Sequence, residues 1–128
     1  MIRQVFQVET YWEVIVFWNI DYNLFGMIEK ELGKCHASPK NIRKVYKDLR
    51  YGNAKAATYS SIYDHVSIVL FNRHKTNRDY INSIVHEAEH VKQDMLYAYY
   101  VEDRGEPPAY TVGYLVMRMY EVFRCLLA

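Results

Sequence analysis

Residues 77–100, NRDYINSIVHEAEHVKQDMLYAYY, carry the pattern around which the rest of the chain is interpreted. Their length and periodicity predict one long helix. At about 100° per residue, one side of this helix is apolar, with Ile81, Ile84, Val85, Ala88, Val91, Met95 and Tyr99. The opposite side is polar, with Asp79, Ser83, His86, Glu87, His90 and Asp94. We therefore expect an apolar back on a core and a polar front in a cleft, with Lys92 as an exception on the apolar side.

The polar side contains the pattern H-E-x-x-H at residues 86–90. Residues four apart lie one above the other on a helix, so the imidazoles of His86 and His90 could bind one metal ion. Glu87 lies about 100° around the axis, where its carboxylate could contact a metal-bound water without binding the metal. Two neutral nitrogen ligands beside such a carboxylate are the arrangement of a zinc hydrolase.

Composition and charge limit the classes of protein that need to be considered. The chain has 128 residues, of which 51% are hydrophobic and 24% charged, with a formal net charge of +1. This favours a single globular domain over residues 1–128. The small net charge does not favour a membrane or nucleic acid as partner. No apolar run approaches the roughly 20 residues of a membrane span, and residues 1–7 lack a signal-peptide core, so we expect a cytoplasmic protein.

The remaining segments predict a small α+β fold. Strands are expected at residues 11–20, 54–62 and 65–72, and helices at residues 23–32, Pro39–Arg50 and 108–126. Gly33 is expected to end the first of these helices, and Ser38 to cap the second. Residues 1–9 give no clear signal. The order of strands and helices predicts helices packed on one face of a small sheet.

The helix Pro39–Arg50 is strongly amphipathic. Ile42, Val45, Tyr46 and Leu49 share its apolar face, and Lys40, Arg43, Lys44, Lys47 and Arg50 share the other. The basic face could bind phosphates. We favour a solvated face, because nothing outside this helix is basic enough to extend the surface.

A catalytic zinc site has three protein ligands and one open position, so a third ligand is needed. Glu106 is the preferred candidate, because it stands before Pro107-Pro108 at the start of the last helix. If that helix folds back antiparallel to residues 77–100, its first turn returns to the level of the two histidines. The competing candidates are Glu102, Asp103, His36, His65 and His74, whereas Asp94 is held too far along the axis.

His86-Glu87-x-x-His90 followed by Glu106 resembles the gluzincins, zinc metallopeptidases whose third ligand is a glutamate on a downstream helix. The resemblance covers about a third of the chain and implies a zincin-like fold in a minimal, single-domain member. Two positions depart from the thermolysin-like pattern: Gly105 stands where Asn precedes the ligand, and Tyr110 where Asp follows it. No third histidine at metzincin spacing follows His90, which argues against that sister group.

The resemblance implies peptide-bond hydrolysis with Zn²⁺ as cofactor and a peptide or protein as substrate. Glu87 would act as general base toward a zinc-activated water, and Tyr110 or Tyr114 could assist as a second electrophile. An extended substrate would lie along a sheet edge, formed by residues 54–62 or 65–72.

Three other interpretations remain open. The chain could be a non-enzymatic zincin-like binding or structural module, in which H-E-x-x-H is structural or vestigial. It could be a nucleic-acid accessory protein acting through the basic face of Pro39–Arg50. Residues 87–90 also contain E-x-x-H, as in di-iron carboxylate bundles, but such bundles need two of these motifs on four helices.

Overall fold

A computed structural model describes residues 1–126 of the chain. The elements in chain order are β1 (Ile2–Val8), β2 (Trp12–Trp18), the 3-10 turn η1 (Tyr22–Leu24), α1 (Phe25–Lys34), α2 (Pro39–Arg50), β3 (Ala56–Ser61), β4 (Val66–Phe71), α3 (Asn77–Ala98) and α4 (Glu106–Leu126). The strands form one mixed sheet in the order β1-β2-β4-β3. β2 and β4 are parallel, and the two outer pairs are antiparallel. The α+β class is confirmed.

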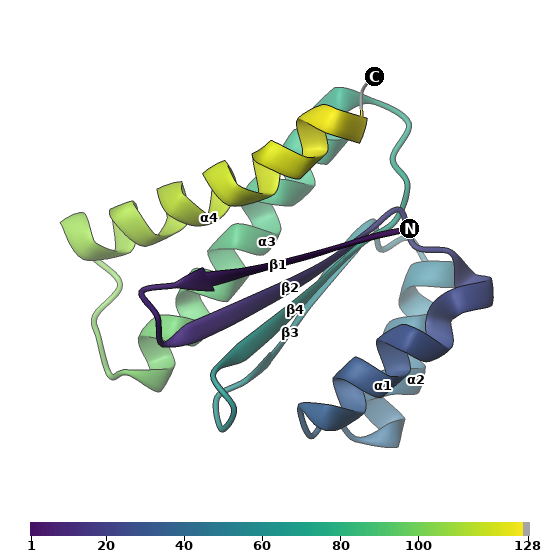
Figure 1. The fold of residues 1–128 in the computed structure, drawn as a ribbon, viewed down its shortest axis with the longest axis horizontal. Helices are drawn as coiled ribbons and strands as arrows, with labels where there is room; N and C mark the ends of the chain where they lie inside the picture. Colours follow the sequence, from purple (N-terminus) through teal and green to yellow (C-terminus); the bar gives the residue numbers. More distant parts are fainter. Residues whose placement is uncertain (127–128) are drawn as a thin grey trace.

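Helices cover both faces of the sheet, so the expectation of helices on one face was wrong. Figure 1 shows α3 and α4 on one side of the strands and α1 and α2 on the other. The two central strands explain this arrangement, because they are apolar on both faces. In β2, Val14 and Val16 point into the core under α3 and α4, whereas Ile15 and Phe17 point into the core under α1 and α2. A strand buried on both faces is a nearly continuous apolar run.

The strand β1 was not predicted, and its turn explains why. β1 pairs with β2 along its whole length, and the two are joined by Glu9, Thr10 and Tyr11, of which the first two have φ angles of 57° and 66°. Left-handed positions in such a turn usually carry Asn or Gly. Glu and Thr give no turn signal, so the hairpin is not visible in the sequence pattern.

The helix ends agree with the sequence in part. Ser38 caps α2 by accepting a hydrogen bond from the Asn41 amide, as expected. The prediction that Gly33 ends α1 was wrong, because Gly33 lies inside the helix. The chain instead turns at His36, which has φ 67°, and the Ala37 amide donates back to the Leu32 carbonyl. This is a Schellman-type ending in which His36 takes the position that usually holds glycine.

Helix α3 lies on the sheet with a face rotated from the expected one. Ile84, Ala88, Val91 and Met95 are buried as predicted, but Ile81 and Val85 are about half exposed. Ser83 and Glu87, which were predicted on the polar side, are buried in their place, and Lys92 is buried as well. The interface therefore takes in part of the side predicted to be polar. None of the helices in residues 1–126 combines the length and apolarity needed to cross a membrane.

Candidate metal centre on helix α3

The two histidines of the H-E-x-x-H motif point at each other from successive turns of α3. Their Nε2 atoms are 3.2 Å apart, and both side chains are exposed. Two nitrogens bound to one tetrahedral zinc at about 2.0–2.1 Å lie roughly 3.3–3.4 Å apart. The distance between the two Nε2 atoms, which are also within hydrogen-bond range of each other, is therefore close to the spacing of two ligands on one zinc ion.

Glu87 lies between these histidines and the sheet. Its side chain is only 6% exposed, and Oε2 lies 4.0 Å from Nε2 of His86. The other oxygen, Oε1, accepts a hydrogen bond of 2.8 Å from the Thr58 hydroxyl on β3. The strand thus fixes the carboxylate, with one oxygen turned toward the histidine and the other toward the sheet. Glu87 was expected on the polar side of the helix with the histidines, but packing on β3 buries it while both histidines remain exposed.

A second set of hydrogen bonds joins α3 to β3 further along the helix. The Ser60 hydroxyl donates to Asp94, one turn beyond His90, at 2.6 Å. Ser60 also lies 2.7 Å from the buried Ser67 hydroxyl, which accepts a hydrogen bond from Nε1 of Trp12. Thr58 and Ser60 are two residues apart on β3, so their side chains lie on the same face of the sheet. The two-residue spacing of Thr58 and Ser60 was the only feature of the sequence that could have predicted their hydrogen bonds to α3.

Lys92 determines where the loop after α3 runs. Its side chain is only 8% exposed, and its ammonium contacts Glu89 at 2.6 Å and Asp103 at 2.8 Å. Burial acts to lower the pKa of Lys92, but the two carboxylates outweigh it and the pKa lies above its ordinary value. Lys92 lies about 200° around the helix from His90. The ion pair with Asp103 therefore holds the loop on the side of α3 away from the histidines.

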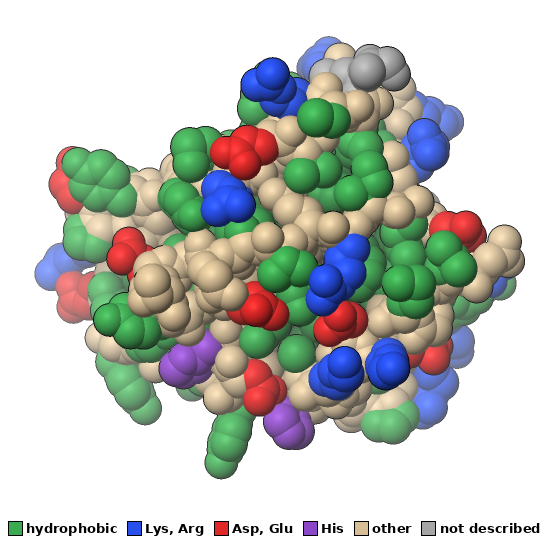
Figure 2. Space-filling model, in the orientation of Figure 1, with side chains coloured by type: hydrophobic (Ala, Val, Ile, Leu, Met, Phe, Trp, Pro, Cys, Tyr) green, Lys and Arg blue, Asp and Glu red, His purple; other side chains and the backbone are tan. Residues whose placement is uncertain are grey.

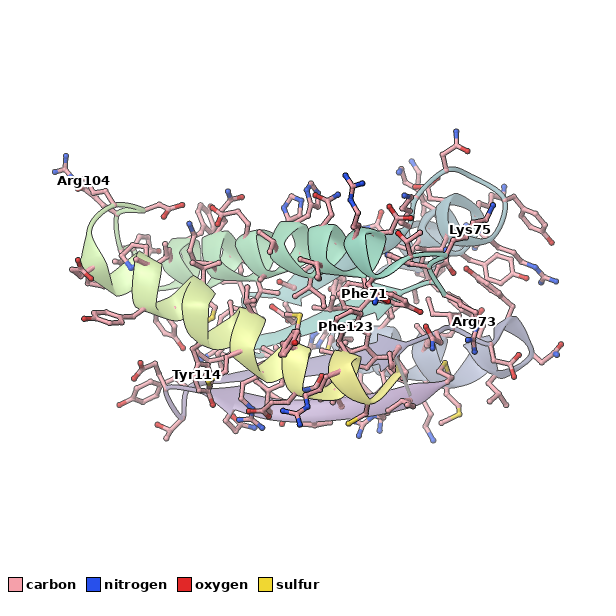
Figure 3. The ribbon with its side chains drawn as sticks, turned by 90° about the horizontal axis from the view of Figure 1, so that it is seen from above. Phe71, Arg73, Lys75, Arg104, Tyr114 and Phe123 are labelled. Carbon is pink, nitrogen blue, oxygen red and sulfur yellow. The ribbon has the colours of Figure 1, made fainter. Side chains whose placement is uncertain are left out.

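Glu106 does not stand level with the histidines in this structure. Thr111, in the second turn of α4, shares a hollow with Met95, Leu96 and Tyr99 at the end of α3. The first turn of α4 consequently lies beyond His90 along the axis, near the loop marked by Arg104 in Figure 3. Among residues 1–126, no group of three or more His, Cys, Asp or Glu side chains is placed to hold a metal ion.

The other carboxylates near Glu106 have partners of their own. Asp103 is bonded to Lys92, and Glu102 forms an exposed ion pair of 2.8 Å with Arg104. Within the described residues, no ion pair or side-chain hydrogen bond involves Glu106, whose side chain is exposed. Glu106 is therefore the uncommitted carboxylate of this loop.

The distant histidines are also engaged elsewhere. His36 pairs with Asp64 at 2.8 Å, and the ring of His65 stacks on Trp12. His74 is buried, with Nε2 2.7 Å from the Ser83 hydroxyl, and its burial lowers its pKa. None of these three joins His86 and His90 in a ligand group.

The tyrosine expected to assist catalysis lies at the other edge of the sheet. The Tyr114 hydroxyl donates to the Gln7 carbonyl on β1 and accepts a hydrogen bond from Arg118. Glu87 contacts β3, and three strand spacings of about 4.8 Å separate the two edges. Tyr114 is thus held away from Glu87, and Tyr110 is largely exposed.

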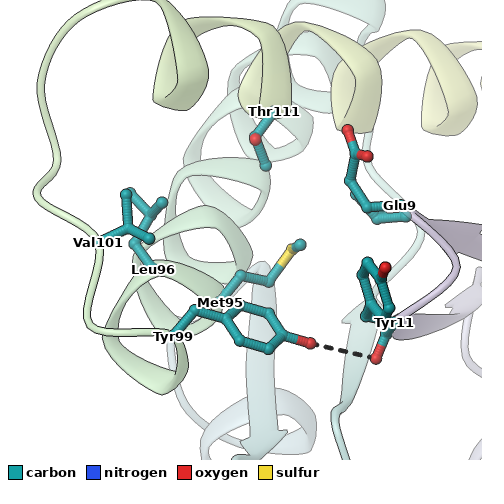
Figure 4. Close-up of a pocket in the computed structure, with 8 residues that line it drawn as sticks. Glu9, Tyr11, Met95, Leu96, Tyr99, Val101 and Thr111 are labelled. Atoms are coloured by element: carbon teal, nitrogen blue, oxygen red, sulfur yellow. Dashed lines mark hydrogen bonds between the residues drawn. The ribbon is translucent and has the colours of Figure 1, made fainter.

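An apolar hollow of about 450 Å³ lies at the far end of α3 (Figure 4). It opens between the α3–α4 loop and the β1–β2 turn, and a hydrogen bond of 3.3 Å from the Tyr99 hydroxyl to the Tyr11 carbonyl crosses it. Glu9 is the one charged residue in its lining, and no histidine contributes. The hollow is therefore separate from the histidine pair.

Comparisons of the chain with protein families, with curated proteins and with solved structures found no match.

Proposed function

We propose that the protein is a zinc-dependent metallopeptidase in which His86 and His90 bind the metal and Glu87 is the general base. The observation that carries this proposal is the 3.2 Å separation of the two Nε2 atoms, beside a carboxylate held by Thr58. Free histidines at positions i and i+4 need not converge on one point. The order of the residues, His-Glu-x-x-His, adds a second argument, because it is the order in which zinc hydrolases carry two ligands and the base.

A zinc ion bound here would supply Lewis acidity and a water of lowered pKa. The protein would supply the proton transfers. Glu87 takes the proton of the attacking water through the oxygen nearer His86 and later gives it to the leaving amine. The hydrogen bond from Thr58 to the other oxygen keeps the carboxylate in one rotamer. Ser60 and Asp94 tie the next turn of α3 to the same strand, so that α3 and β3 form one rigid support.

Glu106 is the third ligand in this proposal, because Glu102 and Asp103 are already paired. Its binding requires the first turn of α4 to move toward the histidines. Gly105 stands directly before it with φ 84°, in the left-handed region that glycine adopts without strain. The turn between the Asp103 contact and α4 is therefore the place where such a movement can occur.

The sheet topology supports an extended peptide as substrate. Of the two strands considered from the sequence, β4 is internal and β3 is at the edge. An edge strand has backbone groups that can pair with an added strand. β3 also supplies Thr58, so a peptide along this edge would pass the carboxylate of Glu87.

The first test is the metal content of protein purified without a metal-affinity tag. We expect about one zinc per chain, by analogy with single catalytic sites, and its nearly complete loss in His86→Ala and His90→Ala. His36→Ala is the matched control, because His36 is exposed and pairs with Asp64. A full complement of zinc in either motif variant would show that the site is misassigned.

The second test separates metal binding from hydrolysis. Glu87→Gln is nearly isosteric and can still accept the Thr58 hydrogen bond, but it cannot take a proton from water. We expect unchanged zinc content and loss of peptidase activity. Activity equal to that of the parent would remove Glu87 from the role of base.

The third test concerns Glu106. Glu106→Ala should weaken zinc affinity strongly, whereas Glu102→Ala and Asp103→Ala, which remove a carboxylate from the same loop, should not. If one of the controls proves sensitive instead, the loop supplies a different ligand. If none of the three matters, the gluzincin assignment should be abandoned.

A second candidate is a non-enzymatic module that keeps the same fold. Two observations favour it: Glu87 is buried, and residues 1–126 contain no assembled group of three ligands. In that case zinc would be absent or bound weakly, and Glu87→Gln would change neither metal content nor any hydrolysis. Metal content and activity measured on the same preparation distinguish the two candidates.

A further inference from the structure

Helix α2 displays positive charge along its whole exposed side. Lys40, Arg43, Lys47 and Arg50 follow one another at spacings of three or four residues, and all four are exposed. Successive turns place such cations about 5.4 Å apart, over a total of roughly 15 Å. Lys44 adds a fifth charge, which is paired with Asp48 at 2.7 Å. In the described residues, no ion pair involves Lys40, Arg43 or Lys47.

The structure extends this basic surface beyond α2, contrary to what the sequence led us to expect. Lys30 of α1 and Arg43 line one shallow hollow between the two helices, together with Glu29. Residues 25–50 contain seven Lys and Arg and three Asp and Glu, whereas residues 77–126 contain five and eight. Figure 2 shows Lys and Arg side chains gathered at the lower right, over α1 and α2, with acidic side chains among them. The net charge of +1 therefore conceals a basic layer and an acidic layer.

A second hollow between α1 and α2 combines these cations with aromatic rings. It has a volume of about 450 Å³ and is lined by Glu29, Arg43, Tyr46, Lys47 and Tyr51. Tyr51 is 71% exposed. The guanidinium of Arg50 lies 5.3 to 5.6 Å from the ring centroids of Tyr22, Tyr46 and Tyr51 and so holds the three rings together. Arg50 lies over one face of the Tyr51 ring, and the 71% exposure of the residue leaves surface for a further stacking partner.

We propose that the α1–α2 layer binds single-stranded nucleic acid. Lys40, Arg43 and Lys47 would contact successive phosphates, and a base would stack on Tyr51 in the hollow. This combination of a cationic track with an exposed aromatic ring is how proteins bind single strands without reading their sequence. In a duplex the bases are stacked on each other, so no base is available to stack on Tyr51. The surface lies on the face of the sheet opposite to the histidine pair, so it does not depend on the proposed peptidase activity.

Fluorescence anisotropy with labelled oligothymidine and oligouridine of about 12 nucleotides tests the proposal, within the site sizes usual for such domains. The full chain should bind at low salt, and the two oligonucleotides distinguish DNA from RNA. Lys40→Gln/Arg43→Gln/Lys47→Gln should weaken binding at least about tenfold and reduce the slope of log affinity against log salt by roughly 2. Arg78→Gln/Arg104→Gln/Arg124→Gln is the matched control, because it removes three exposed cations from the other layer.

The stacking contact needs a test of its own. Tyr51→Ala should weaken binding about tenfold without changing the salt slope, whereas Tyr100→Ala, which removes a 97% exposed tyrosine elsewhere, should have no effect. Circular dichroism and thermal melting check that each variant is folded. Absence of binding at low salt, or equal losses in the two triple variants, would overturn the proposal. So would duplex binding as tight as single-strand binding, or competition by polyglutamate equal to that by the oligonucleotide, which would indicate an acidic protein partner.

Discussion

The two helical layers cover opposite faces of one sheet but bury different kinds of side chain. The buried residues of α1 and α2 are all apolar: Phe25, Ile28, Leu32 and Leu49. Helix α3 buries Ser83, Glu87 and Lys92 beside its apolar residues. Charge on α1 and α2 is therefore kept on the outside, whereas α3 carries charge into its interface with the sheet and the following loop.

This difference indicates where the fold serves something other than stability. Burying a charged group costs free energy unless it is paired and hydrogen-bonded, and an apolar residue at the same place would pack without that cost. Glu87 is held by Thr58, and Lys92 by Glu89 and Asp103. Polar groups retained in a packed interface are a common feature of functional sites. The proposed anion-binding surface of the α1–α2 layer needs no buried polar groups, because its cations contact the ligand from exposed positions.

The largest effect is expected in the apolar layer. Leu32→Ala creates a cavity at a residue that is 1% exposed and should lower the free energy of unfolding by about 2–5 kcal/mol. Urea denaturation measures it, with Leu24→Ala as a control at an exposed position. Zinc content below the unfolding transition should be unchanged. If Leu32→Ala releases the metal from folded protein, the two layers are not independent.

A smaller effect is expected at the polar interface of α3. Thr58→Val keeps the shape of the side chain but removes the donor to the Glu87 carboxylate, which should cost about 1–2 kcal/mol. It should also lower peptidase activity while zinc content is kept, because the carboxylate loses its fixed rotamer. Thr111→Val, which removes an exposed hydroxyl bonded within α4, is the matched control. A stability loss without any change in activity would make Thr58 purely structural.

The sequence predicted the elements whose signal is local. Helix α2 begins and ends where expected, because Ser38 caps it and its apolar residues recur with helical spacing. The strands β2, β3 and β4 were also found, with boundaries shifted by one to two residues. These are segments in which neighbouring residues determine the backbone.

Features that depend on distant residues were missed. β1 is invisible because Glu9 and Thr10 form a turn without Asn or Gly. The burial of Glu87 depends on Thr58, 29 residues earlier. The apolar runs of β2 and β4 did indicate strands, but their meaning for the number of helical layers was overlooked.

In the candidate site, too, the part set by local spacing could be predicted from the sequence, and the part set by distant residues could not. His86 and His90 lie four residues apart on one helix, so the sequence predicts that they are neighbours, and their rotamers then bring the two nitrogens to 3.2 Å. The position of Glu106 relative to them depends on the loop between two helices. Lys92 holds that loop through Asp103, and at sequence level this lysine was only an exception to the apolar pattern. A buried cation opposite the motif is the signal that could have indicated the course of the loop.

A pH-dependent effect is expected at His74, which is buried next to Ser83 at the start of α3. Its burial lowers its pKa in the folded state below the value of about 6.5 in the unfolded chain. The neutral ring therefore stabilises the fold fully above about pH 6.5, and this contribution is lost as the pH falls toward the folded-state pKa. In the presence of a chelator, unfolding free energies between neutral and mildly acidic pH should fall less steeply for His74→Gln than for the parent.

The exposed His36 provides the comparison for this measurement. His36→Gln removes a ring that is 69% exposed and pairs with Asp64 at 2.8 Å, so it measures how much of the pH dependence comes from this exposed ion pair and not from the burial of His74. If His36→Gln flattens the pH profile and His74→Gln does not, burial at the start of α3 is not its cause.

The smallest effect on stability is expected on the exposed side of α2, where the two layers differ most in charge. Asp48 forms an exposed ion pair with Lys44, and such pairs four residues apart on a helix contribute only about 0.3–0.5 kcal/mol. Its negative charge also lies in the last turn of α2, where the helix dipole disfavours it. Asp48→Asn should therefore change the free energy of unfolding by less than about 0.5 kcal/mol. It should nevertheless tighten the binding of oligothymidine and steepen its salt dependence by up to about 0.7, because Lys44 becomes free to contact a phosphate. Glu121→Gln, which removes an acidic residue paired with Arg118 on α4, is the control and should leave oligothymidine binding unchanged. If both substitutions tighten binding equally, the oligonucleotide responds to net charge alone, and the α1–α2 layer is not the surface that binds it.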